Sequence, residues 1–160
     1  MGVDGILINN GKLTAAQVQV RETGNHGIYI TNGTAVIRDS IVAKAGAVGV
    51  QAQADTGKVT NATIERTTVA NSTYEGIFAY GNGGTASVLA VDNVVSDNTS
   101  QSGIVALNGT VRASGNTVTR VAAWGLFNGG GSTFESAQDN FVQGNGAGPT
   151  AGTITNVGRF

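Results

Sequence analysis

The side chains best suited to acid–base chemistry in this 160-residue chain are its single histidine and its scattered carboxylates. His26 lies in the turn-like sequence Asn25-His26-Gly27, and a general base there would need a partner within hydrogen-bond reach. Five acids stand at turn or strand-end positions, where Asp commonly bonds to its own backbone: Asp39, Glu65, Asp92, Asp97 and Asp139. We therefore expect no catalytic residue among them.

Metal and cofactor chemistry is not indicated either. The chain has no Cys, and no repeat carries the acidic glycine-rich nonapeptide that binds calcium. The glycine-rich stretches near Ala54–Gly57 and Gly81–Gly84 lack the Gly-Lys-Ser/Thr of a phosphate loop. Arg66, Arg112 and Arg120 are isolated in the sequence and are expected to be solvated. The sequence therefore predicts neither a metal site nor a cofactor.

The composition is that of an all-β protein with tight turns. Charged residues make up only 12% of the chain, apolar residues 40%, and Gly occupies 25 positions. Helical proteins need Lys, Glu and Arg on their wet faces, so small polar residues must supply this surface instead. The net charge of −1 comes without a basic stripe, and no apolar run is long enough to span a bilayer. Nucleic acid and membrane are therefore not expected partners.

A repeat organises the whole chain. Gly followed by alternating apolar residues recurs in steps of 22, 22, 27, 27 and 22 residues. These coils start near residues 5, 27, 49, 76, 103 and 125, with a degenerate seventh copy at Gly152-Thr-Ile-Thr155. Each contains a second and a third short strand. Because one coil buries its inner side chains only against its neighbours, the pattern predicts a solenoid spanning residues 1–160 as one domain.

Asparagines mark the turn between the second and third strands of the later coils, at Asn93, Asn116 and Asn140. The earlier coils have Ser40 and Thr67 there. A carboxamide both donates and accepts, so stacked copies can form a hydrogen-bonded ladder, and Asn tolerates the left-handed backbone of such corners. We expect a structural ladder, continuous only in the C-terminal half.

This repeat pattern, as in Gly27-Ile-Tyr-Ile and Asn93-Val-Val, resembles the repeat of the pectate-lyase-like superfamily over nearly the whole chain. The ending from Glu135 to Asn145 and then Gly152 to Thr155 is similar to the C-terminus of uncharacterised secreted bacterial β-helix proteins. The resemblance implies a right-handed parallel β-helix of about six coils with three short strands each. It also implies a longer parent that is secreted or displayed at the cell surface, of which this chain is expected to be a truncated part.

In that superfamily the outer face of the first strand usually forms the glycan cleft, so its side chains matter most. If Ile28 and Ile30 point inward, strand alternation turns Tyr29 outward. The resulting stripe comprises Leu7, Tyr29, Thr31, Gln51, Phe78, Tyr80, Val105, Leu107 and Phe127. It contains none of the carboxylates or basic residues that the superfamily's lyases and polygalacturonases need. Asn25-His26-Gly27 resembles the Gly-His-Gly of polygalacturonases, but it lacks the first Gly and the partner carboxylates.

An outward apolar stripe usually marks an interface or a ligand groove, or else is covered by another part of the chain. The segment 144–160 is a candidate cap, with Phe141, Ile154, Val157 and Phe160 as apolar contacts, and its last residues could instead fold over the stripe. Trp124 is expected to plug a corner rather than to stack on a ligand.

The favoured function is a non-catalytic extracellular or cell-surface scaffold that self-associates through the stripe or through its open N-terminal end. The alternatives are a carbohydrate-binding module and a fragment of a lyase-like, polysaccharide-active enzyme. In the former, Tyr29, Phe78, Tyr80 and Phe127 would be sugar platforms, with Val105 and Leu107 beside them. The expected partners are accordingly a second copy of the chain or a neutral glycan.

Overall fold

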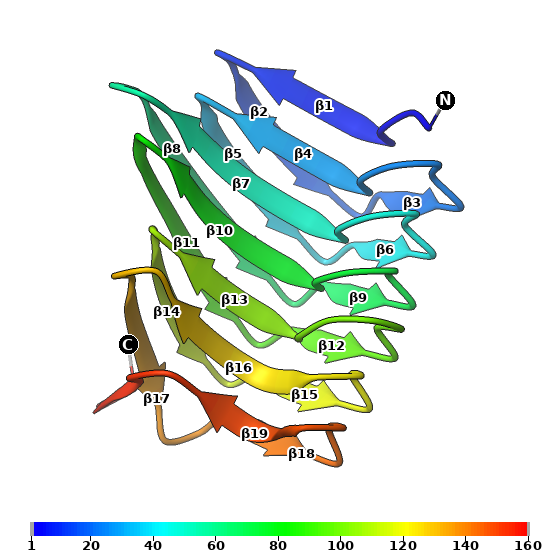
Figure 1. Ribbon diagram of the computed structural model, residues 1–160. Coiled ribbons are helices and arrows are strands. Elements are labelled where there is room, and N and C mark those ends of the chain that lie inside the picture. Colours follow the sequence, from blue (N-terminus) through cyan, green and yellow to red (C-terminus); the bar gives the residue numbers. More distant parts are fainter. Residues whose placement is uncertain (1, 160) are drawn as a thin grey trace.

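Three parallel sheets run along the solenoid, and each coil contributes one strand to each sheet (Figure 1). The computed structural model describes residues 2–159, and its regular elements there are all strands. No helix among these residues could therefore cross a membrane. The first and last coils lie at opposite ends of the stack (Figure 1).

The strands follow the order of the coils. Sheet A comprises β1 (Ile6–Asn9), β4 (Ile28–Thr31), β7 (Val50–Asp55), β10 (Ile77–Asn82), β13 (Ile104–Leu107), β16 (Trp124–Gly129) and β19 (Gly148–Ala151). Sheet B comprises β2 (Lys12–Ala16), β5 (Thr34–Arg38), β8 (Val59–Glu65), β11 (Thr85–Val91), β14 (Thr110–Ser114), β17 (Thr133–Ala137) and β20 (Thr155–Val157). Sheet C comprises β3 (Gln19–Arg21), β6 (Ile41–Ala43), β9 (Thr68–Ala70), β12 (Val94–Ser96), β15 (Thr117–Thr119) and β18 (Phe141–Gln143).

The core consists of equivalent side chains stacked from coil to coil. In sheet A, Ile28 pairs with Val50, Val50 with Ile77, and Ile77 with Ile104, and all four are fully buried. The recurring glycine and the valine of sheet C are one packing unit. A Cβ at Gly49 would lie 2.3 Å from Val69 Cγ1 and 2.6 Å from the Gly76 carbonyl oxygen. The same contact recurs in every full coil, which explains why the two residue types share one period.

Amide side chains connect the later coils at the corner between sheets B and C. Asn93 Nδ2 donates to Asn116 Oδ1 at 3.0 Å, and Asn116 Nδ2 donates to Asn140 Oδ1 at 2.9 Å. The backbone N–H of Thr67 donates to Asn93 Oδ1, which extends the column to the preceding coil.

The arginines expected to be isolated are in fact paired with acids of neighbouring coils. Arg66 Nε lies 2.7 Å from Asp39 Oδ1, and Arg120 Nε lies 2.7 Å from Asp97 Oδ1, while Arg112 meets Glu135. Sequence reasoning missed these pairs because the partners are 23 to 27 residues apart. They are exposed, so solvent screens the charges and each pair contributes little to stability.

The C-terminal segment differs from the prediction. β19 pairs with β16 through Trp124 and Gly148 and through Leu126 and Thr150, and β20 pairs with β17. Pro149, not Gly152, therefore occupies the position of Gly125. The segment adds a partial seventh coil to the expected six, continuing the solenoid instead of folding over the stripe; Phe160 lies outside the described residues.

Candidate functional site

The stripe residues lie in two parallel rows on the outer face of sheet A. The register joins the first set from coil to coil, and we call it the central row: Leu7, Tyr29, Gln51, Phe78, Val105, Phe127 and Ala151. The second set, the outer row, lies two residues further along each strand: Asn9, Thr31, Gln53, Tyr80, Leu107 and Gly129.

A third row, which the alternation did not predict, flanks the central row. It consists of the residue before each repeat glycine, whose carbonyl accepts a hydrogen bond from the glycine of the preceding coil. We call it the preglycine row: Asp4, His26, Val48, Glu75, Ser102 and Trp124. The His26 and Tyr29 rings stack with their centroids 4.7 Å apart, and Glu75 and Trp124 line a hollow together with Phe78 and Phe127.

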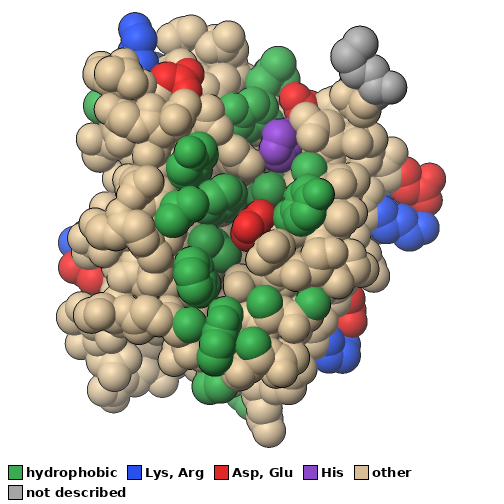
Figure 2. Space-filling model, viewed as in Figure 1, with side chains coloured by type: hydrophobic (Ala, Val, Ile, Leu, Met, Phe, Trp, Pro, Cys, Tyr) green, Lys and Arg blue, Asp and Glu red, His purple; other side chains and the backbone are tan. Residues whose placement is uncertain are grey.

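The three rows line a groove on this face. Figure 2 shows a band of hydrophobic side chains running down this face, with the histidine and an acidic residue beside it. Val105 and Gln51 are only 4% and 7% exposed, so the stripe is not the fully wet patch that the sequence suggested. The hollow in the C-terminal half has a volume of about 240 Å³, with Trp124 on its lining. Trp124 is thus half-buried at the groove, where a ligand can reach it.

Asp4 holds His26 in place from the preceding coil. Asp4 Oδ1 accepts from His26 Nδ1 at 2.9 Å, from the His26 backbone N–H at 3.0 Å and from Asn25 Nδ2 at 2.8 Å. An ionised carboxylate only accepts, so the imidazole proton stands on Nδ1 and Nε2 is the nitrogen left for a ligand. His26 therefore does have a partner carboxylate, contrary to the sequence interpretation, because Asp4 lies 22 residues earlier.

Glu75 is the acid that sequence reasoning overlooked at this face. Glu75 lines the hollow with Phe78 and Ser102, and burial raises the pKa of its carboxyl group above the ordinary value. Burial likewise raises the pKa of the Tyr29 hydroxyl. A half-buried acid among aromatic rings can hydrogen-bond a hydroxyl-rich ligand in either protonation state.

Amide side chains form the polar part of the groove along β7. Gln51 Nε2 donates to Gln53 Oε1, and Gln53 Nε2 donates to Asp55 Oδ1, each at 3.0 Å. Asn32 Nδ2 donates to Asp55 Oδ2 at 2.9 Å, and this contact, followed by those from Gln53 and Asn82, lowers the pKa of the Asp55 carboxyl. The chain of bonds fixes the orientation of each amide, as a polar recognition surface requires.

The charge of the three rows has one sign. Asp4 and Glu75 belong to them, and no Lys or Arg does. Within residues 2–159 no group of three or more potential ligands could hold a metal ion. The groove is therefore suited to an uncharged ligand with both apolar faces and hydroxyl groups.

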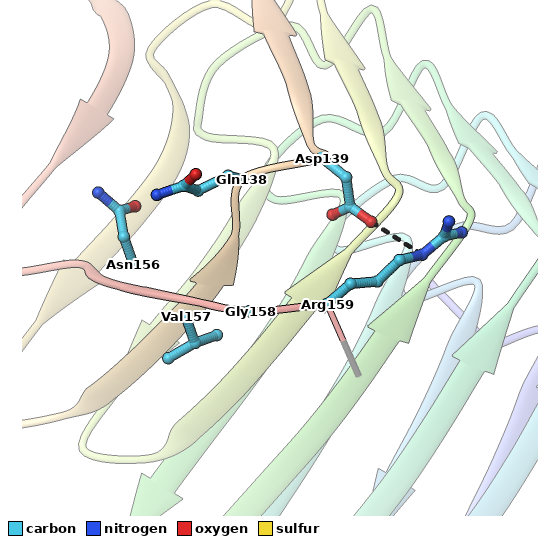
Figure 3. A pocket seen from close by; sticks show the side chains of 6 residues that line it. All are labelled: Gln138, Asp139, Asn156, Val157, Gly158 and Arg159. Carbon is cyan, nitrogen blue, oxygen red and sulfur yellow. Dashed lines mark ion pairs between the residues drawn. The ribbon is translucent and has the colours of Figure 1, made fainter.

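A second hollow, of about 500 Å³, lies where the chain ends, away from sheet A (Figure 3). Arg159 Nε lies 3.1 Å from Asp139 Oδ2 there. The Asp139 pKa is lowered, first by the Gly115 backbone N–H and more weakly by Arg159. None of the residues lining this hollow is aromatic. The Arg159–Asp139 ion pair links the C-terminal segment to the last coils. The hollow, which lacks an aromatic side chain, is a weaker candidate for a ligand site.

Comparison with known proteins supports the architecture. A family model described as "Right handed beta helix region" matches residues 4–153. The crystal structure of the periplasmic alginate epimerase AlgG T265N mutant is similar, with a TM-score of 0.62 at 11% sequence identity. The alignment covers 96% of this chain and 48% of that one, so the chain spans about half the length of that protein. At this identity the likeness shows the fold alone. No curated protein shows significant sequence similarity to the chain.

Proposed function

The chain belongs to the family of right-handed β-helix regions, and from that premise we propose that it binds a neutral polysaccharide in the sheet A groove. The observation that carries the proposal is the mixture of groups in one groove. Aromatic rings of the central row lie beside oriented amides and a half-buried acid. Sugars present apolar C–H faces and hydroxyl edges, and such a surface complements both.

The proposal is binding without turnover. Hydrolysis of a glycosidic bond ordinarily takes two carboxyl groups that flank the bond. Asp4 is engaged by three donors of the Asn25-His26 turn, and Asp55 accepts from three amides. Glu75 is thus left without a second free carboxylate in the three rows. The enzyme-fragment alternative would need groups supplied from outside residues 2–159.

The proposed place of action is outside the cytoplasm. The similar structure is that of a periplasmic protein. A groove for polysaccharide is also most useful where such chains occur.

Affinity electrophoresis in gels containing neutral or anionic polysaccharides tests the proposal. We expect at least one neutral polysaccharide to retard the protein, and Phe127→Ala to reduce the retardation about tenfold in apparent affinity. Phe141→Ala is the matched control, because Phe141 is 55% exposed on sheet C, away from the groove. Absence of retardation in every neutral gel, or release of shortened or unsaturated products, would contradict the proposal.

Self-association through the same face is the second candidate function. Leu7, at the N-terminal end of the central row, is 55% exposed, and an exposed apolar side chain there favours contact with another molecule.

A further inference from the structure

Aromatic rings occupy every second position of the central row. Tyr29, Phe78 and Phe127 alternate with Gln51 and Val105, and the two intervals are each 49 residues long. The two side chains between the rings are buried, so only the alternate positions offer a ring to a ligand. Because neighbouring strands lie about 4.8 Å apart, the rings recur about every 9.6 Å along the solenoid axis.

The planes of the Phe78 and Tyr80 rings cross the direction of strand β10. Phe78 and Tyr80 are two residues apart on β10, yet they stack with centroids 5.5 Å apart and planes within 17° of each other. Their planes therefore run along the solenoid axis. Tyr80 covers one face of Phe78, and the other face is turned toward the hollow that it shares with Glu75. The central row is thus an interrupted aromatic wall beside a slot.

We infer that the slot takes an extended β-1,4-linked chain of neutral hexopyranoses, lying along the solenoid axis. In such a chain each sugar is turned over relative to the one before it, so alternate sugars present the same face to one wall. One disaccharide is about as long as the interval between the rings. The first and third sugars would then stack on Phe78 and Phe127, whereas the face of Tyr29 on this side is already covered by His26.

Two other classes of chain fit less well. An α-1,4-linked chain coils and cannot keep three sugars in line against one wall. An anionic chain would bring carboxylates next to Glu75 and Asp4, in rows that hold no Lys or Arg. This inference rests on the proposed function, since it names the class of polysaccharide that the groove binds.

Calorimetric titration with cello- and manno-oligosaccharides of two to six sugars tests the register. A trisaccharide can bridge Phe78 and Phe127, so we expect affinity to rise about tenfold from two to three sugars. Each step beyond three sugars should be small. Maltohexaose and an oligogalacturonate of equal length should bind at least tenfold more weakly than cellohexaose or mannohexaose.

Phe78→Leu keeps the apolar volume and removes the middle ring. Every trisaccharide that bridges two rings uses Phe78, so in this variant the step from two to three sugars should disappear. Phe141→Leu, outside the groove, should keep this step. A smooth gain with each added sugar, or preference for the α-linked or anionic chain, would overturn the inference while leaving groove binding in place. Lack of binding by the entire panel would overturn both.

Discussion

At each corner between sheet C and sheet A, glycine is required because of close contacts and not because of an unusual backbone angle. The repeat glycines are absent from the left-handed region of φ, unlike Gly57 or Gly115. Instead, their missing Cβ makes room for a valine of sheet C and for the next glycine's carbonyl. The chain can bend there only because no side chain competes for that space, and the bend turns the preglycine residue toward the groove.

Gly103→Ala should therefore destabilise the protein strongly. A Cβ at Gly103 would lie 2.3 Å from Val118 Cγ1 and 2.6 Å from the Gly125 oxygen, and neither group can move without shifting a coil. Overpacking of this kind typically costs about 1–3 kcal/mol in the free energy of unfolding, and the two close contacts place Gly103→Ala at the upper end of that range. Gly11→Ala is the control, since its nearest contact would be an ordinary 3.5 Å from Ile8 Cγ2. Equal midpoints of urea unfolding for the two variants would refute this account.

Glu75 should contribute more to the stability of the folded protein at low pH than at neutral pH. Its pKa is raised by burial in the folded state, so the folded protein binds more protons than the unfolded chain between the ordinary pKa of 4.5 and the raised value. Its contribution to stability is present below pH 4.5 and is lost as the pH rises through the raised pKa. Glu75→Gln should thus increase the Tm at pH 7 and leave it unchanged near pH 4. The opposite order would mean that a cation, not burial, governs this carboxyl.

Among the elements of the fold, the asparagine column joins coils that are otherwise held by strand pairing and apolar contact. Asn116 is fully buried and donates to Ala90 and Asn140, while its oxygen accepts from the backbone and side chain of Asn93. Asn116→Ala leaves several of these groups without partners, at a cost of about 2–3 kcal/mol. Asn61→Ala, on the exposed side of β8, should cost less than about 0.5 kcal/mol. Thermal unfolding of the two variants measures the difference.

The regular parts of these elements could be predicted from sequence because they obey a period. Ile28 and Ile30 point inward and Tyr29 outward as strand alternation requires, and the glycine and valine repeats coincide because these residues touch. Alternation fails at the corner: His26 and Tyr29 are three residues apart yet stack on one face. Contacts between coils, such as Asp4 with His26, have no local signal. The glycine pattern predicts the seventh coil three residues too late, because Pro149 stands where the other coils have Gly.

Over the whole molecule, charge is segregated. Lys44 is paired with Glu22 and Arg112 with Glu135 outside the groove, whereas the groove rows hold Asp4, Glu75 and His26 but no Lys or Arg. Binding of a neutral glycan should therefore release few ions. We expect its Kd to change less than twofold between about 0.05 and about 0.5 M NaCl. A severalfold weakening by salt, measured by calorimetry, would indicate an anionic ligand held by the corner cations.

The same face cannot hold a second molecule and a polysaccharide at once, so oligomer and ligand should compete. Solenoids associate through exposed apolar rows or uncovered strand edges, and the central row is the apolar surface of sheet A. We expect light scattering at high protein concentration to give a mass above 16.1 kDa, and saturating hexasaccharide to return it to 16.1 kDa. Tyr29→Lys combined with Phe78→Lys should give the monomer mass without ligand, since like charges would then face each other across the contact. A mass that stays high in both cases would assign association to the coil ends, where the strands of the outermost coils leave N–H and C=O groups unpaired.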